Sequence, residues 1–213
     1  MPAFAPSTLH DEHVTLEPLC REHAPALERA AADGELWQLA VTSVPAPGQA
    51  LGYIEKALHG QTAGTMLPFA VREAGSGEIV GTTRYYELEP DVPRLAIGYT
   101  WYARRWQQTH LNTACKRLLL EHAFATFGCV AVAFHTDVLN TASQRAIARL
   151  GAQREGLLRA HKRRADGSLR DTVCFSLLAT AWPDAKRQLD ARLTRLVQSA
   201  RSRNTAMHRP GDR

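Results

Sequence analysis

The hydrophobic and polar positions of the chain follow strand and helix periods in turn. Strand patterns occupy 13–19, 66–73, 78–90, 94–103, 129–139, 152–164 and 169–182. Helical spacing occupies 21–40 (with a turn at Asp33–Gly34), 49–61, 114–127, 140–151 and 183–197. This order of elements predicts an α/β fold, with a mixed sheet and helices on both of its faces.

Turn and cap residues support these boundaries. Residues Ala74–Gly77 have the composition of a hairpin turn, and "ADGS" at 165–168 suits a second one. Gly128 suits the left-handed position after a helix, and Asn140 suits a helix N-cap. Neither internal repeats nor a linker is visible, so the pattern predicts a single domain over 13–198.

The two ends of the chain differ from this domain. Residues 1–12 lack a periodic pattern and are predicted to be a flexible leader. Residues 199–213 hold four arginines and one aspartate, which makes a basic tail that we expect to be disordered. The formal net charge is +5, and the tail contributes +3 of it, so the domain itself is close to neutral. Nucleic-acid binding is therefore not favoured.

Composition indicates a soluble, cytoplasmic protein. Apolar residues make up 45% of the chain, which is enough for a core, but no apolar run approaches the roughly 20 residues of a membrane span. A secretory signal pattern is absent from the N-terminus. The four cysteines show no CxxC spacing and are expected to be buried free thiols, and we predict no metal site.

The stretch "RWQQTHLNTACK", Arg105 to Lys116, joins a strand pattern to a helix pattern. A helix N-terminus offers unpaired backbone N–H groups and a positive dipole end, which can hold a phosphate. Phosphate-binding loops usually contain glycine, and this loop has none. The residues alone leave open whether it binds phosphate or is an ordinary connection.

A second polar feature is the start of the helix at 140–151. Helical periodicity places Ser143 on the same face as Ile147 and Leu150. A hydroxyl on an apolar face in the first turn points inward at the end of a strand. The simpler interpretation is a capping pair, with Asn140 as the N-cap and Ser143 as a small residue of the first turn.

Together these motifs resemble the GNAT-type N-acetyltransferases. The resemblance covers roughly His13 to Leu193 and is strongest over "IGYTWYARRWQQ", Asn140-x-x-Ser143, Leu150-Gly151-Ala152, Glu155-Gly156, Asp166-Gly167 and Asp171. Within that superfamily the chain is similar to the RimJ/RimL-type group, which acetylates N-termini of ribosomal proteins. The resemblance implies a mostly antiparallel sheet whose central strands splay apart at the cofactor site.

The resemblance also implies acetyl-CoA as the donor. Asn140 and Ser143 would contact it, and Ser143 would protonate the leaving thiolate. The opening loop aligns with the pyrophosphate-binding stretch of the family. The implied contacts there are Trp106, Gln107, Gln108, Thr109, His110, Leu111, Asn112, Thr113 and Lys116.

This loop departs from the family pattern, because Gln108, His110 and Asn112 stand where two glycines and a small residue are usual. Two outcomes remain open. The backbone keeps its N–H groups available with the side chains turned outward, or the loop binds the cofactor weakly or not at all. Lys116 would add positive charge for the phosphates, or it is part of a solvated helix face.

The base that takes the proton from the amine is not assigned by sequence. In the ribosomal group a carboxylate acts from the strand after Glu155-Gly156, and the corresponding residue here is Lys162. Lysine is protonated at neutral pH unless it is buried. His161 and His135 are candidates with suitable ordinary pKa values, although a lone histidine on a strand is more often structural.

The acceptor would enter from the face opposite the cofactor. Candidate lining residues are Trp37, Arg84, Tyr86 and Trp101, for which ordinary core packing is the alternative. Because side chains alternate along a strand, Arg84 and Tyr86 share one side and Tyr85 takes the other. An arginine in the cleft would favour an acceptor that carries a carboxylate.

These features lead to one expected function and two alternatives. We expect an acetyl-CoA-dependent N-acetyltransferase that acts on a primary amine, either of a protein N-terminus or of a small molecule. A detoxifying acetyltransferase for small amines or amino-acid analogues is one alternative. The other is a non-catalytic acyl-CoA-binding relative. A homodimer is common among such proteins, but this sequence gives no independent sign of one.

Overall fold

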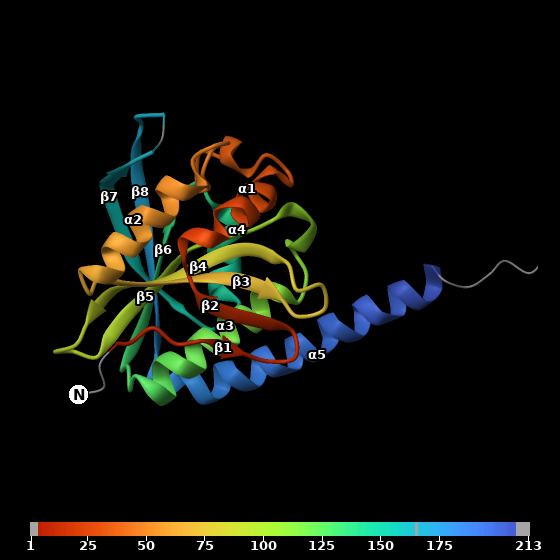
Figure 1. Cartoon of the computed structure of the whole chain (residues 1–213). Coiled ribbons are helices and arrows are strands. Elements are labelled where there is room, and N and C mark those ends of the chain that lie inside the picture. The colour runs from red at the N-terminus through yellow and green to blue at the C-terminus, as the bar shows by residue number, and fades with distance from the viewer. Residues whose placement is uncertain (1–3, 165, 208–213) are drawn as a thin grey trace, which may run out of the picture.

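The described residues form an eight-stranded sheet at the centre of the fold, with the strand order β1-β2-β3-β4-β5-β6-β8-β7 (Figure 1). The computed structural model describes residues 4–164 and 166–207. The strands are Leu9–His10 (β1), Val14–Pro18 (β2), Met66–Glu73 (β3), Ile79–Glu89 (β4), Arg94–Tyr102 (β5), Ala131–Asp137 (β6), Gln153–Arg163 (β7) and Leu169–Leu178 (β8). Strands β5 and β6 pair in parallel, and the other described pairs are antiparallel. The predicted mixed, mostly antiparallel sheet is confirmed.

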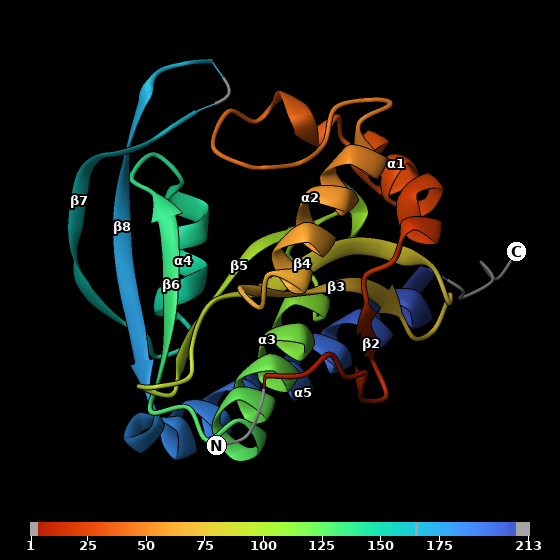
Figure 2. The ribbon, with the colours of Figure 1, turned by 60° about the vertical axis from the view of Figure 1, so that its left-hand side comes forward.

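Helices cover both faces of this sheet. Helices α1 (Ala24–Ala32) and α2 (Ala50–Thr62) lie on one face, where Leu27 and Ile54 are fully buried (Figure 2). Helices α3 (Leu111–Glu121), α4 (Thr141–Ala148) and α5 (Trp182–Met207) contribute to the larger core on the other face. Short turns of 3₁₀-helix occupy Arg21–His23, Leu36–Gln38, Arg104–Trp106 and Ala179–Ala181.

A bulge in β5 changes which way its side chains point. Pairing with β4 runs from Tyr85↔Ile97 and Arg84↔Gly98 directly to Thr82↔Trp101, so β5 has one extra residue at this point. Tyr99 sits there with φ +51, a left-handed conformation that costs a non-glycine residue about 1 kcal/mol or more. Before the bulge Ile97 faces the α3 core, whereas after it Trp101 faces the α1 and α2 core.

The pairing of β5 with β6 is very short. It covers only Arg94–Ala96 against Ala131–Ala133. Beyond these residues the two strands diverge, as Figure 2 shows, while β6 continues to pair with β8 as far as Asp137. The facing edges of β5 and β6 beyond the divergence therefore have backbone N–H and C=O groups that no neighbouring strand uses.

Both predicted ends of the domain need correction. The leader is not entirely loose, because Leu9–His10 pairs with β2 and Phe4 packs against Phe127. The tail is helical as far as Met207, since α5 continues past the expected end and Leu189 and Leu193 fix its first half to the core. Residues 1–3 and 208–213, which also belong to the predicted leader and tail, lie outside the described residues.

The remaining element predictions agree closely with the structure. Gly77 and Gly128 have the positive φ values expected for a hairpin turn and for the end of a helix. The predicted helix ending at Phe127 has a π-helical last turn over His122–Thr126, which the sequence pattern did not reveal. The cysteines are free as predicted, but only Cys115 and Cys129 are fully buried.

Candidate active site

The carboxyl ends of β5 and β6 define the candidate site. Because these two strands are parallel, the loop after β5 and the loop after β6 emerge at the same edge of the sheet. The first loop leads to α3 at Leu111, and the second leads to α4 at Thr141. Both predicted groups of cofactor contacts, in the "RWQQTHLNTACK" stretch and at Asn140 and Ser143, therefore flank the point where the strands separate.

The loop after β5 keeps a glycine-like conformation without glycine. Gln108 has φ +60, in the left-handed region that glycine adopts most readily. Thr109 Oγ1 donates to the carbonyl oxygen of Trp106 at 2.8 Å and accepts from the N–H of Leu111 at 3.3 Å. Within the described residues, no acceptor is found for the backbone N–H groups of Gln108, Thr109, His110, Asn112 and Thr113.

The side chains that replace the usual glycines are held by other contacts. Gln108 is exposed to solvent, and the His110 ring packs edge-on against His13 at 5.3 Å between ring centroids. The amide oxygen of Asn112 accepts a hydrogen bond from the Tyr102 hydroxyl at 3.2 Å. These side chains therefore do not engage the unpaired N–H groups, and we call this set of free donors at the N-terminus of α3 the cradle.

The positive character of this cradle comes mainly from the backbone. Burial lowers the pKa of His110, and the neighbouring His13 lowers it further, so His110 is mostly neutral at pH 7. Arg105 is paired with Asp33 at 3.0 Å and with Glu78 at 2.5 Å. Arg117 is paired with Asp190. The helix dipole and the free N–H groups are thus the main features of this loop that favour an anion.

Lys116 does not occupy the position expected from the sequence. It is the sixth residue of α3 instead of a first-turn residue, and it is only 6% exposed, so the solvated-face alternative is wrong. Its ammonium donates to Thr100 Oγ1 at 2.8 Å, directly beneath the β5 bulge. Thr100 Oγ1 also lies 2.8 Å from Thr83 Oγ1. Burial lowers the pKa of Lys116 to about 8.

The predicted capping pair at the start of α4 is confirmed. The side chain of Asn140 accepts a hydrogen bond from the backbone N–H of Ser143 at 2.9 Å. Ile147 and Leu150 are buried in the core, and Ser143 on the same face is half-buried. The hydroxyl of Ser143 therefore lies at the inner start of the helix, at the edge where β6 ends.

The expected acceptor-side residues all lie on the α1 and α2 face. Trp101 is buried and its indole N–H donates to the Tyr53 hydroxyl at 3.3 Å, in the same core that contains half-buried Trp37. For Trp101 the core-packing alternative is correct. Arg84 and Tyr86 are also buried, and each packs against Tyr99 of the bulge.

Sequence reasoning missed Tyr53 and Tyr99. Arg84 lies between their rings, at 4.4 Å from the Tyr53 centroid and 4.6 Å from the Tyr99 centroid. The position of Tyr99 depends on the bulge, which reverses the alternation expected from a regular strand. Tyr53 had a detectable signal, because it is an aromatic residue within an otherwise amphipathic helix pattern.

The two candidate histidines differ in environment. His135 is half-buried on β6, and its Nδ1 lies 3.1 Å from the Tyr86 hydroxyl oxygen and 3.5 Å from Glu87 Oε2. Burial lowers the pKa of His135, and the adjacent Glu87 partly opposes this change. His161, in contrast, is exposed on β7. Only His135 is therefore within the cluster formed by Tyr86, Tyr99 and Arg84.

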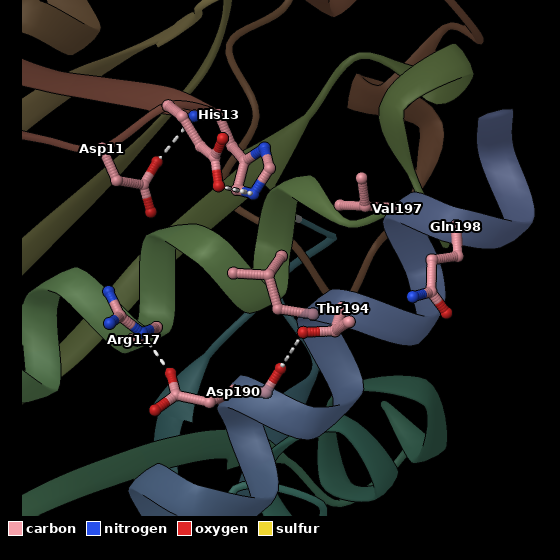
Figure 3. A pocket seen from close by; sticks show the side chains of 9 residues that line it. Asp11, His13, Arg117, Asp190, Thr194, Val197 and Gln198 are labelled. Carbon is pink, nitrogen blue, oxygen red and sulfur yellow. Dashed lines mark hydrogen bonds and ion pairs between the residues drawn. The ribbon is translucent and has the colours of Figure 1, made fainter.

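A separate pocket of about 630 Å³ lies between the β1–β2 turn, α3 and α5 (Figure 3). Asp11, Glu12 and Asp190 bring three carboxylates to its lining, and Arg117 is already paired with Asp190. Such a lining disfavours an anionic ligand. We therefore do not assign this pocket to the candidate active site.

The described residues contain neither a metal-binding cluster nor a helix suited to span a membrane. No cluster of three or more metal-ligating side chains occurs within 4–164 and 166–207. Over the same part of the chain, no helix combines the length and the apolar character that crossing a bilayer requires.

Comparisons with known proteins agree with this geometry. The model of the acetyltransferase (GNAT) domain family matches residues 13–153. The chain is 26% identical over 172 residues to p20 of Bacillus licheniformis, an uncharacterised N-acetyltransferase, covering 80% of this chain and 96% of p20. A crystal structure of a GCN5-related N-acetyltransferase from Brucella melitensis superposes with a TM-score of 0.80 at 26% identity, covering 90% of this chain and 87% of that one.

A third comparison concerns a structure with coenzyme A. Mycobacterium smegmatis RimJ in complex with CoA-disulfide has a TM-score of 0.74 at 23% identity, over 88% of this chain and 95% of that one. At this identity the likeness establishes a shared fold. The domain match extends over most of the sequence, and the chain therefore belongs to the GNAT family of acetyltransferases. It is an N-acetyltransferase, and the donor used by its family is acetyl-CoA.

The buried Lys116 leads to a prediction about stability and pH. Its pKa is about 8 in the folded chain against an ordinary 10.5, so the unfolded chain binds more protons between these pH values. The free energy of unfolding should therefore rise with pH over this window, by up to about 3 kcal/mol relative to Lys116→Met. Urea unfolding of both proteins from pH 7.5 to 10.5 measures this difference.

Lys162→Met is the matched control, because Lys162 is an exposed lysine on β7. Its unfolding free energy should follow the wild-type dependence on pH. Parallel pH curves for the wild type and Lys116→Met would contradict the prediction.

Proposed function

We propose that this protein transfers the acetyl group of acetyl-CoA directly to a primary amine in a ternary complex. The amine belongs to a protein N-terminus or to a small molecule. The observation that carries the proposal is the set of unpaired N–H groups of Gln108, Thr109, His110, Asn112 and Thr113, next to the separated ends of β5 and β6.

The residues present fit coenzyme A in two respects. The free N–H groups at the start of α3 suit a pyrophosphate, because they combine donors with the positive end of a helix dipole. The unpaired strand edges of β5 and β6 suit the amide groups of a pantetheine chain, which can hydrogen-bond as an added strand does. Trp106, Gln107, Leu111 and Asn140 would surround the same ligand. Lys116 would support the bulge from below instead of contacting phosphate.

Acetyl-CoA supplies a thioester whose carbonyl carbon an amine can attack. The protein then needs to orient the amine, accept its proton and donate a proton to the departing sulfur. We propose that His135 accepts the proton. Its lowered pKa keeps it neutral at pH 7, and Tyr86 and Glu87 surround Nδ1. A carboxylate beside Nδ1 favours the N–H form of that nitrogen, which leaves Nε2 as the basic atom.

We assign proton donation toward the sulfur to Ser143. Its support is the half-buried position in the first turn of α4, at the edge where the cradle also lies. The backbone N–H of Ser143 donates to the side chain of Asn140, and this cap fixes the first turn of the helix. The backbone position from which the Ser143 hydroxyl projects is therefore fixed.

A first prediction tests donor binding through the unusual loop residue. Gln108→Gly relieves left-handed strain, whereas Gln108→Val increases it because β-branched residues tolerate positive φ poorly. At an acetyl-CoA concentration about 100 times its dissociation constant, ligand adds about 2.7 kcal/mol to unfolding. Gln108→Gly should keep this gain, and a tenfold weaker affinity in Gln108→Val should reduce it to about 1.4 kcal/mol.

Thermal unfolding with and without acetyl-CoA provides the measurement. If acetyl-CoA stabilises the two Gln108 variants equally, the loop is not part of the donor-binding site. A wild-type melting temperature that millimolar acetyl-CoA leaves unchanged would contradict donor binding altogether.

A second prediction concerns the proton acceptor. His135→Gln should lower kcat by about a hundredfold or more, as expected for loss of a positioned base. The wild-type kcat should fall on acidification below about pH 6.5, because His135 then becomes protonated and its folded pKa lies below the ordinary histidine value. This inflection should disappear in the variant.

His161→Gln is the matched control, since His161 is an exposed histidine of the neighbouring hairpin. It should change kcat by less than about threefold. Thiol release measured against pH distinguishes the two histidines. A larger loss in His161→Gln than in His135→Gln would reverse our assignment.

A third prediction concerns Ser143. Ser143→Ala should reduce kcat about tenfold or more while the affinity for acetyl-CoA changes little, because a proton donor acts mainly in the transition state. Thr141→Ala removes an exposed hydroxyl from the same helix turn and should leave both quantities unchanged. If Ser143→Ala turns over at the wild-type rate, Ser143 is not the proton donor.

A further inference from the structure

The side chain of Arg84 has an unusual combination of burial and missing partners. It is 2% exposed on β4, and its Nε and Nη2 atoms have no hydrogen-bond partner among the described residues. Its remaining nitrogen, Nη1, has only a weak contact with the sulfur of Met66 at 3.9 Å. No carboxylate of the described residues lies within ion-pair distance of this guanidinium.

The two unpartnered atoms form one edge of the guanidinium. The Nε–H and Nη2–H donors point in the same direction, and this pair of donors matches the two oxygens of a carboxylate. The guanidinium carbon lies over the Tyr53 ring, 4.4 Å from its centroid, and over the Tyr99 ring, 4.6 Å from its centroid. Two aromatic rings thus hold the guanidinium in place. Its Nε–Nη2 edge, which can bind a carboxylate, has no hydrogen-bond partner among the described residues.

Stacking on aromatic rings does not satisfy these donors. Cation–π contacts stabilise a desolvated cation by less than burial without an ionic partner destabilises it. An arginine retained only for packing would be better replaced by a neutral side chain of similar size. The missing partner is therefore expected to come from a ligand.

The position of Arg84 connects it to the proposed acceptor side. Tyr99, which contacts the guanidinium, is the bulge residue of β5 beyond its pairing with β6, and the centroid of its ring lies 5.2 Å from that of Tyr86. Tyr86 in turn contacts His135. Tyr53, Met66 and Tyr99 are each partly exposed, so the guanidinium lies one side chain below the surface.

We propose that Arg84 binds a carboxylate of the acceptor, and that this enzyme prefers primary amines that carry one. The proposal rests on the proposed function and deepens it. The carboxylate is either the α-carboxylate of a free amino acid or an acidic side chain near the N-terminus of a peptide. Tyr53 and Tyr99 hold the guanidinium, and its Nε–H and Nη2–H groups donate to the two oxygens of the ligand's carboxylate.

The test compares acceptors that differ only in this charge. One arm pairs L-methionine, L-phenylalanine and L-leucine with their α-carboxamides. The other pairs the peptide amides Ser-Glu-Ala and Ser-Gln-Ala. Thiol release gives kcat/KM for each, and the ratio of the charged to the neutral acceptor is the quantity compared. The ratio should exceed about tenfold in one of the arms, as expected for a charged hydrogen-bonded pair. The arm that shows it identifies the source of the carboxylate.

Substitution of Arg84 should remove this preference. In Arg84→Met the ratio should fall to within about threefold of one, and Arg84→Lys should give an intermediate ratio, because lysine keeps the charge without the paired donors. Arg187→Met removes an exposed arginine of α5 and serves as the control for net charge, with the wild-type ratio expected. If Arg84→Met fails to fold, the charged-to-neutral ratios of the wild type and of Arg84→Lys test the proposal.

A binding measurement separates this proposal from the proposed function. Titration calorimetry of N-acetyl-L-methionine and its amide, with coenzyme A present, reports the same preference without turnover. A wild-type ratio near one in both acceptor arms and in calorimetry overturns the role of Arg84, as does a ratio that survives in Arg84→Met. Absence of thiol release from every amine, with the calorimetric preference intact, overturns the proposed function but not the carboxylate site.

Discussion

The separation of β5 from β6 is the constraint on which the rest of the site depends. Two parallel strands in the middle of a sheet would normally pair along their length, and here they pair over three residues. A bulge with one extra residue at Tyr99–Thr100 follows soon after the end of this pairing, and a bulge bends the strand that contains it. The left-handed strain at Tyr99 therefore lies at the candidate site, where the surrounding structure compensates for it.

The bulge also divides the chemistry between two faces of the sheet. Toward α3, Thr100 and Thr83 meet the buried ammonium of Lys116. Toward α1 and α2, Tyr99 contacts both Arg84 and Tyr86. The bulge thus supplies a neighbour to each of two buried cations on opposite faces of the sheet, because Tyr99 contacts Arg84 and Thr100 contacts Lys116.

Most of the fold could be predicted from the sequence because it depends on periodicity and turn chemistry. Asn140 as a cap and Gly128 after a helix are local signals with local causes. The isolated Gly98 within the strand was a weak local signal for the bulge, but the residue that adopts the left-handed conformation is Tyr99, which no local pattern indicates. The burial of Lys116 depends on how α3 packs on β5, and no local pattern contains that information. The same limit applies to the candidate site, where Arg84 and Tyr86 were found by alternation while Tyr99 required the tertiary structure.

The large core is distributed unevenly about the line where the strands separate. On the α3 side a continuous core includes Ile97 of β5, Phe134 of β6 and Leu189 of α5, so it joins both halves of the sheet. On the α1 side the contacts that cross the line are few, with Tyr86, Ala96 and Ala133 forming a small cluster. The two half-sheets are therefore joined by a large core on the side of α3 and α5 and by a small cluster on the side of α1. With this distribution the gap between the half-sheets can widen on the α1 side while the core on the α3 and α5 side stays packed, so acceptors of different size can be accommodated without disrupting the main core.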